Sequence, residues 1–372
     1  MRVGVLTGGG DCPGMNAVIR AVTKSLLRQC NAEVVGIEDG FAGLMEDGRT
    51  RTLDWRSVCG ILYSGGTVLG TSNRANPLAT EASAQAALAR ASALGLDALV
   101  AIGGDGTMTI ANGLALRGLK VVGVPKTIDN DIEGCERSFG FDTAVNTVTQ
   151  ALERLQTTGQ SHSRVMIAET MGRYSGWIAL EAGLAGAADI ILLPEIDFDV
   201  QAVLAVCRER AKRQRFTLIC IGEGAKPIGG QMTVERRQTD SPDPIRLGGV
   251  GHVLRDMLQP HLASEVRATV LGHVQRGGMP TPFDRVLATQ FGTAAAQLVL
   301  RGEFNRMVTL QGGQLSSVPI DQVAARNRRV PLNHPLLRAA RHIGISLGDG
   351  EGSKSVESGD AAQAVPAVTS RP

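Results

Sequence analysis

The chain has 372 residues, more than one hydrophobic core usually supports, so two domains are expected. A net charge of +2 and an aromatic content of 3% argue against a nucleic-acid partner, because neither a basic surface nor stacking platforms are evident. The one dense basic run, residues 208–215, is typical of a solvated helix end. The sequence shows neither an apolar run of membrane-spanning length nor the apolar stretch of a signal peptide, so we expect a cytoplasmic protein that binds no membrane.

Short apolar runs alternate with helical patterns along the chain. The runs have the length and the Val, Ile and Leu content of buried strands. In chain order they are "RVGVLT", "AEVVGI", "DALVAIG", "KVVGVP", "RVMIAET", "DIILLPE", "FTLICIG" and "RATVLG". This alternation predicts an α/β fold with two Rossmann-like three-layer domains, mainly parallel sheets and an active site in the cleft between the domains.

The first predicted strand runs into "TGGGDCPGMNAVIR". Glycines such as Gly9 let the backbone approach a phosphate, and a helix expected from about Asn16 offers free N–H groups. The segment has neither the GK[ST] of a Walker A loop nor the GxGxxG spacing. A tight strand-to-helix turn without a ligand is the alternative.

The third predicted strand ends in "AIGGDGTM". Asp105 lies between Gly104 and Gly106, with Thr107 next to them, where a helix should begin. A carboxylate among glycines at a helix N-terminus can hold Mg2+ while backbone amides bind phosphate oxygens. As an alternative, Asp105 only caps the helix.

The next strand ends in "GVPKTIDNDI", about twenty residues downstream. In an extended segment, residues two apart point the same way, so Asp129 and Asp131 should face one ligand. One carboxylate would take a hydroxyl proton, and Lys126 would meet phosphate. Taken alone, "DND" is also a good turn sequence, but two acidic loops at successive strand ends indicate a metal–phosphate site.

Cationic residues also lie at or next to predicted strand ends, and the planar guanidinium groups of the arginines among them suit phosphate. They are Arg164, Arg173, Arg267, His273 and Arg276. Surface salt bridges are the alternative for any one of them. Their number indicates a second phosphate, on the acceptor, and Glu223 would then meet a sugar hydroxyl or make a structural hydrogen bond.

Together these segments resemble the phosphofructokinase family, in order, over about residues 1–310. The matching segments are "TGGGDCPGMNAVIR", "GGTVLGTSN", "GGDGT", "PKTIDNDI", "FGFDTA", "MGRYSGWIAL" and "LGHVQRGG". The set is highly specific. The resemblance implies a glycolytic transferase that moves the γ-phosphate of ATP, with Mg2+, to the 1-hydroxyl of fructose 6-phosphate.

The resemblance also implies roles for single residues. Asp129 would be the general base, Arg173 would stabilise the transferring phosphoryl group and Asp105 would hold Mg2+. The acceptor would be bound by Thr127, Asp129, Arg164, Met171, Gly172, Arg173, Glu223, Arg267, His273 and Arg276. The donor would be bound by Gly9, Arg74, Gly104, Asp105, Gly106 and Thr107. Two of the arginines would reach across from a neighbouring subunit, which implies a homodimer or homotetramer with shared active sites.

The nature of the donor depends on two positions. In the family, pyrophosphate users usually carry Asp where this chain has Gly106 and Lys where it has Lys126, and ATP users carry Gly at both. The chain thus resembles the mixed-substrate branch. A carboxylate at position 106 would repel and crowd a nucleotide α-phosphate, so Gly106 favours ATP. The arginine that bridges donor phosphates in short bacterial members would be Arg74, one position late, so its role is open.

A second set of strand and helix units begins near residue 140, so we expect residues 1–140 with roughly 260–305 to form a nucleotide- and Mg-binding domain. Residues 141–259 with roughly 306–345 are expected to form a sugar-phosphate-binding domain. Residues 346–372, rich in Gly, Ser, Ala and Pro, are expected to be a flexible tail.

Three other functions stay open. The first is the same fold with pyrophosphate as donor. The second is an NAD or lipid kinase, which shares "GGDGT" but leaves "PKTIDND" and "LGHVQRGG" unexplained. The third is a non-catalytic sugar-phosphate-binding regulatory protein, which would not need a base. Sedoheptulose 7-phosphate is an alternative acceptor, and allosteric effectors are not defined by the sequence.

Overall fold

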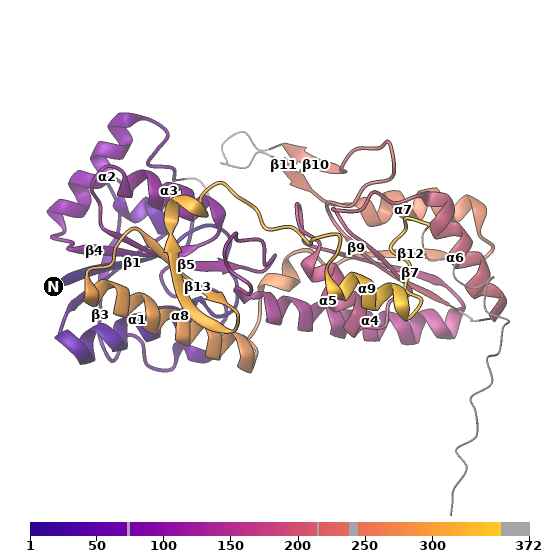
Figure 1. The fold of residues 1–372 in the computed structure, drawn as a ribbon, viewed down its shortest axis with the longest axis horizontal. Helices are drawn as coiled ribbons and strands as arrows, with labels where there is room; N and C mark the ends of the chain where they lie inside the picture. The colour runs from indigo at the N-terminus through magenta and orange to yellow at the C-terminus, as the bar shows by residue number, and fades with distance from the viewer. Residues whose placement is uncertain (73–74, 214–215, 238–244, 351–372) are drawn as a thin grey trace, which may run out of the picture.

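The structure is a computed structural model and describes residues 1–72, 75–213, 216–237 and 245–350 (Figure 1). Over these residues the chain forms two mainly parallel sheets, each covered by helices on both faces. The predicted α/β fold is therefore confirmed. None of the helices in these ranges combines the length and the apolar character needed to cross a membrane.

The larger sheet has eight strands within the described part of the chain. They are β1 (Arg2–Thr7), β2 (Glu33–Ile37), β3 (Thr50–Leu53), β4 (Ala98–Gly103), β5 (Val121–Thr127), β6 (Phe139–Gly140), β13 (Arg306–Gln311) and β14 (Gln314–Pro319). Their order is β14-β13-β5-β4-β1-β2-β3, with β6 beside β5. The edge strands β3 and β14 are antiparallel to their neighbours, and the inner pairs are parallel. All six residues of β4 are buried, as expected for a strand with helices on both faces.

Helices α1 (Met15–Cys30) and α8 (Pro282–Arg301) pack together on one face of the larger sheet, and α2 (Glu81–Ala93) and α3 (Asp105–Ala115) lie on the other (Figure 1). The close contact of α1 and α8 needs Gly292, because a Cβ there would lie 2.7 Å from the Cβ of Ala21. Three short 3-10 helices complete this half: η1 (Gly40–Leu44), η2 (Ile61–Tyr63) and η5 (Ile320–Gln322).

The smaller sheet has four parallel strands in the order β12-β7-β9-β8 within the described residues. They are β7 (Val165–Thr170), β8 (Ile190–Leu192), β9 (Thr217–Gly222) and β12 (Val266–Val270). Its helices are α4 (Phe141–His162), α5 (Trp177–Ala185), α6 (Val200–Arg213), α7 (Val250–Leu258) and α9 (Pro335–His342), with the 3-10 helices η3 (Gln259–His261) and η4 (Gly272–Arg276). Helices α4, α5 and α9 cover one face, and α6 and α7 cover the other (Figure 1). A separate hairpin joins β10 (Val234–Arg237) to β11 (Ile245–Leu247).

The expected assignment of segments to domains is wrong at two places. Strand β12, which was expected with the first domain, pairs with β7 in the smaller sheet. Strands β13 and β14, which were expected with the second domain, extend the larger sheet beside β5. The chain therefore returns to the larger-sheet half later than expected, with α8, and leaves it again only after η5, before α9.

The expected tail also starts too early. Ser346 forms a parallel bridge to Ile190 of β8, and Leu347 is only 1% exposed. The backbone N–H of Asp199 donates to the carbonyl of Gly348 at 2.7 Å. Residues 346–348 thus belong to the folded smaller-sheet half, and residues 351–372 lie outside the described residues.

Candidate active site

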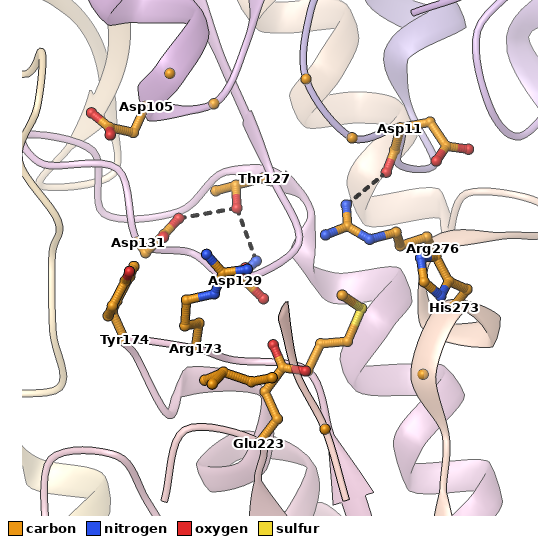
Figure 2. Close-up of a pocket in the computed structure, with 18 of the residues that line it drawn as sticks. Asp11, Asp105, Thr127, Asp129, Asp131, Arg173, Tyr174, Glu223, His273 and Arg276 are labelled. Atoms are coloured by element: carbon orange, nitrogen blue, oxygen red, sulfur yellow. Dashed lines mark hydrogen bonds between the residues drawn. The ribbon is translucent and has the colours of Figure 1, made fainter. Parts of the chain in front are cut away.

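A cavity of about 930 Å³ lies between the two halves of the molecule. Residues from the carboxyl ends of β1, β4 and β5 line one side of it, and residues from the ends of β7, β9 and β12 line the other. Carboxyl ends of parallel strands meet at one edge of a sheet, so two sheets that face each other at these edges bring many loops to one place. The predicted cleft site is therefore present (Figure 2).

The glycine loop after β1 is contacted by the side chains of Thr71, Lys126 and Arg276. Gly9 has a left-handed φ of 75°, and its carbonyl accepts a hydrogen bond of 2.5 Å from the hydroxyl of Thr71. The carbonyl of Gly10 accepts from the ammonium of Lys126. A Cβ at Gly10 would lie 2.5 Å from a guanidinium nitrogen of Arg276, so the bare backbone permits this close approach. Gly9, Gly10 and the adjacent Asp11 all line the cavity.

The "GGDGT" loop joins β4 directly to α3. Gly103 has no room for a side chain, because a Cβ there would lie 2.2 Å from the hydroxyl oxygen of Thr107. Gly106 is exposed, and a Cβ there would meet nothing within 4 Å. Gly104, Asp105, Gly106 and Thr107 line the cavity together, as the sequence predicted.

Asp105 is the first residue of α3, and its Oδ1 is enclosed without a hydrogen-bond partner among the described residues. Burial raises the pKa of Asp105, and the backbone N–H groups of Ala325 and Arg326 oppose that rise. No group of three or more His, Cys, Asp or Glu side chains suited to a metal is found in the described ranges. Such a lone carboxylate fits Mg2+, which proteins usually hold through one or two carboxylates, waters and the phosphates of a substrate.

The two carboxylates after β5 both line the cavity, but not for the reason the sequence suggested. Asn130 has a left-handed φ of 52°, so the segment is a turn and not an extended strand. The turn is fixed by the side chain of Asn130, which is 3% exposed and accepts from the backbone N–H of Ser138 at 3.0 Å. Asp129 and Asp131 therefore share the cavity because of this turn.

Burial raises the pKa of both carboxyl groups. For Asp131 the negative charge of Asp129 adds to the effect of burial and brings the pKa to about 7. The charges of Arg276, Arg173 and Lys126 oppose the rise at Asp129. The Oδ1 of Asp129 is enclosed and makes no hydrogen bond within the described residues. This oxygen of Asp129 is therefore able to accept a hydrogen bond or a proton from a ligand in the cavity.

Lys126 reaches under the glycine loop and is only 4% exposed. Burial lowers its pKa, and Arg276 adds to the lowering, whereas Cys12, Asp11 and Asp131 oppose it. Its ammonium group lies beside the loop expected to hold the donor phosphates, and the residue lines the cavity.

The smaller sheet supplies Met171, Arg173 and Glu223 to the cavity. Gly172 itself does not line it, but its left-handed φ of 126° turns the chain between Met171 and Arg173. Burial raises the pKa of Glu223 to about 8, with the charge of Asp129 adding to the rise and that of Arg173 opposing it. The three charged groups, Asp129, Arg173 and Glu223, thus influence one another across the cleft (Figure 2).

His273 and Arg276 come from η4, after β12, and also line the cavity. A guanidinium nitrogen of Arg276 donates to the carbonyl of Asp11 at 3.2 Å (Figure 2). Arg276 therefore bridges the two halves of the molecule.

Two predicted arginines are not brought to this cavity. Arg164 precedes β7, and Arg267 is the second residue of β12, so both lie at the amino ends of their strands. Their side chains pair with Glu265, at 2.5 Å for Arg164. A six-residue strand spans roughly 17 Å between its ends, which separates them from the cavity of their own chain. Arg74 lies outside the described residues.

Several residues lining the cavity were missed by the sequence interpretation. They are Asp11, Glu169, Tyr174, His252 and Asn327. Asp11 directly follows a glycine run and could have been found by the same signal as Asp105. Tyr174 directly follows Arg173 in "MGRYSGWIAL" and could have been found with it. Glu169 in β7, His252 in α7 and Asn327 have no local signal, because segments distant in sequence carry them to the cavity. Glu169, for example, is 2% exposed and accepts from the backbone N–H groups of Gly249 and Gly251 at 2.8 and 2.7 Å.

Comparison with known proteins places these features in a family. The family model described as "Phosphofructokinase" matches residues 2–299. The chain is 48% identical over 332 residues to "ATP-dependent 6-phosphofructokinase 2" of Streptomyces coelicolor, covering 89% of this chain and 97% of that protein. It is 47% identical over 331 residues to "Pyrophosphate--fructose 6-phosphate 1-phosphotransferase" of the same organism, covering 89% and 96%.

A solved structure is also similar. The crystal structure of Pichia pastoris phosphofructokinase in the T-state matches with a TM-score of 0.77 and 29% identity over 87% of this chain. This chain covers 37% of the length of that yeast chain. Because the family model matches most of the sequence, residues 2–299 of 372, the chain belongs to the phosphofructokinase family.

Proposed function

We propose that this protein is an ATP-dependent 6-phosphofructokinase, which transfers the γ-phosphate of ATP to the 1-hydroxyl of fructose 6-phosphate. The observation that carries the proposal is the enclosed Oδ1 of Asp129, which has no hydrogen-bond partner in the described part of the chain. Asp129 lines the same cavity as Asp105 and Arg173. A phosphoryl-transfer enzyme needs a proton acceptor, a metal-holding carboxylate and a cation at one place. A regulatory binding protein would need no such base.

In the proposed reaction, Asp129 accepts the proton of the 1-hydroxyl as that oxygen forms a bond to the γ-phosphorus. The bond between the γ-phosphorus and the β,γ-bridging oxygen breaks, and ADP leaves. Arg173 neutralises charge on the transferring group, and its positive charge opposes the rise that burial causes in the pKa of Asp129. When bound, Mg2+ would neutralise charge on the donor phosphates, and Asp105 would hold it.

ATP as the donor is supported by Gly106. Because a Cβ at this position would meet nothing within 4 Å, the space beside it is open for a nucleotide. The relative called ATP-dependent 6-phosphofructokinase 2 agrees with this reading.

Pyrophosphate is the second candidate donor. Lys126 favours it, since its ammonium lies beside the glycine loop, and a relative of similar identity is named for pyrophosphate.

We further propose a homodimer or homotetramer in which Arg164 and Arg267 of one copy complete the acceptor-phosphate site of another. Both arginines lie away from the cavity of their own chain, and Arg267 is exposed. Large apolar side chains are exposed around β12 and the start of α8, as expected for a surface that another copy covers. They are Val270, Val274, Met279, Phe283 and Val286. A cytoplasmic location stays a prediction.

Mixing two inactive variants tests the shared site. Asp129→Asn and Arg164→Ala should each be nearly inactive alone, but mixed oligomers would contain some sites with neither change. In a dimer with two shared sites, such mixing restores about a quarter of the wild-type turnover. No restored activity, although co-purification through a tag on only one of the two variants shows mixed oligomers, would contradict shared sites.

The proposed reaction is tested with fructose 6-phosphate and Mg2+, using ATP and pyrophosphate side by side at several concentrations. We expect fructose 1,6-bisphosphate to form with ATP, and the reaction to stop when EDTA removes Mg2+. Turnover with pyrophosphate but not with ATP would show that pyrophosphate is the donor. Binding of fructose 6-phosphate without turnover by either donor would favour a regulatory protein.

A further inference from the structure

Residues 325–330 form a strap that crosses from the larger-sheet half to the smaller-sheet half, between η5 and α9 (Figure 1). It carries the sequence "ARNRRV", to which the sequence analysis assigned no role. Asn327 of the strap lines the cavity. The strap therefore runs beside the proposed active site while joining the two halves.

On the larger-sheet side, the strap holds the turn that carries Asp129. The backbone N–H of Arg328 donates to the carbonyl of Asp131 at 2.7 Å. A guanidinium nitrogen of Arg328 donates to the carbonyl of Asn130 at 3.1 Å. Asn327 also forms an antiparallel bridge with Ile132. Arg328 thus binds the carbonyls of the two residues that directly follow the proposed base.

On the smaller-sheet side, the same guanidinium lies over the ring of Trp177, 4.2 Å from its centroid. Trp177 is 2% exposed and begins α5, directly after the loop that carries Arg173. A second connection lies two residues along the strap, where the N–H of Val330 donates to Glu195 at 2.8 Å. The carboxylate of Glu195 also accepts from the N–H of Gly176 at 3.1 Å.

One side chain therefore contacts both segments that hold the reacting groups. The turn at Asn130 is left-handed, a conformation that asparagine adopts more readily than most non-glycine residues, and its contacts with Ser138 and Arg328 hold it in place. Arg328 provides such contacts and ties them to a buried aromatic ring in the other half. Glu181 and Glu136 are among the acidic residues whose charge acts on Arg328, so a purely structural ion cluster is the competing explanation.

We propose that Arg328 is a positioning residue, which sets the turn carrying Asp129 against the loop carrying Arg173 without touching either substrate. The inference rests on the proposed function. Its consequence is specific: loss of Arg328 should lower kcat, which depends on the placement of base and cation, more than it changes the binding of either substrate.

The kinetic test compares Arg328→Ala, Arg328→Lys and the control Arg329→Ala. Arg329 is the exposed neighbour on the same strap, so its removal takes away an equal charge from the same segment. Arg328→Ala should lower kcat by about 10- to 100-fold, the scale of a small misplacement of reacting groups, with KM for both substrates within about threefold of wild type. Arg328→Lys keeps the charge but loses the planar guanidinium group, so its kcat should lie between those of the wild type and Arg328→Ala. Unchanged kcat in Arg328→Ala, an equal loss in Arg329→Ala, or a loss confined to KM would overturn the proposal.

A second readout does not depend on turnover. Hydrogen exchange of the backbone amides in residues 128–132 should become faster in Arg328→Ala and stay unchanged in Arg329→Ala. Unchanged exchange in this segment would overturn the proposal even if kcat fell. If the wild type shows no turnover, the proposed reaction fails, and the exchange result still decides whether Arg328 holds the turn. Thermal unfolding of each variant, monitored by circular dichroism, shows whether a lower kcat or a faster exchange comes only from a loss of folding.

Discussion

The hydroxyl of Thr127 donates a hydrogen bond of 3.0 Å to Oδ1 of Asp131 (Figure 2). The same hydroxyl oxygen accepts from the backbone N–H of Asp129 at 3.0 Å. The bond to Asp131 lowers the pKa of that carboxyl, against the larger effect of burial. Thr127 therefore fixes both acidic residues of the turn through one oxygen atom.

Replacing Thr127 by Val keeps its shape and removes this oxygen. Each of the two hydrogen bonds of this hydroxyl contributes about 1 kcal/mol net, and about 1.4 kcal/mol corresponds to a tenfold change in rate, so we expect kcat to fall by about 5- to 30-fold. Thr127→Ser keeps the hydroxyl and should retain most of the activity. Steady-state kinetics of both variants checks this, and equal kcat values for Val and Ser would show that the hydroxyl does not matter.

Gly106 is predicted to control the choice of donor. In Gly106→Asp the new carboxylate has room but should repel and crowd the α-phosphate of ATP, so kcat/KM for ATP should fall by about tenfold or more, with a smaller effect on pyrophosphate. Gly106→Asn is the matched control, because it adds equal bulk without charge. An unchanged ratio of kcat/KM for the two donors in Gly106→Asp would assign the choice to other residues, with Lys126 the first to test.

Glu223 should make the ligand-free protein less stable as the pH rises. Its pKa in the folded protein is about 8, raised from 4.5 mainly by burial, so the folded state holds the proton more tightly than the unfolded state. The stability due to this proton is complete below about pH 4.5 and is lost as the pH rises to about 8.

Glu223→Gln resembles the protonated form and tests this directly. It should raise the melting temperature at pH 8.5 by about 2–4 °C, corresponding to about 1 kcal/mol, and change it little at pH 5. Asp131 also titrates in this range but is present in both proteins, so its effect largely cancels in the difference. A melting temperature difference that does not vary with pH would contradict the prediction.

A local signal was enough to locate Asp105 and Asp129 at the cavity, whereas Arg164 and Arg267, expected from predicted strand ends, lie away from it. Asp105 and Asp129 each follow a buried strand and stand beside glycine or turn residues, and both line the cavity. The extended geometry expected for Asp129 to Asp131 was wrong, and the turn that "DND" offered as the alternative is present. The contacts of Asn130 with Ser138 and Arg328, which fix this turn, come from residues outside the motif.

The connections between the halves were also beyond the sequence patterns. Alternation of strands and helices predicts parallel sheets, but it does not say to which sheet a strand is added. Strands β12 and β13 were therefore assigned to the wrong halves. Residues such as His252 and Asn327 reach the cavity only through this tertiary arrangement, and neither lies in a recognisable motif.

The central claim is that Asp129 is the base of a phosphoryl-transfer site. The measurement that tests it most directly is the turnover of Asp129→Asn with fructose 6-phosphate, Mg2+ and ATP, together with the binding of fructose 6-phosphate by calorimetry. The account predicts a kcat lower by about 10²- to 10⁴-fold, the usual range for loss of a general base, with binding retained. Near-normal turnover in Asp129→Asn would contradict it.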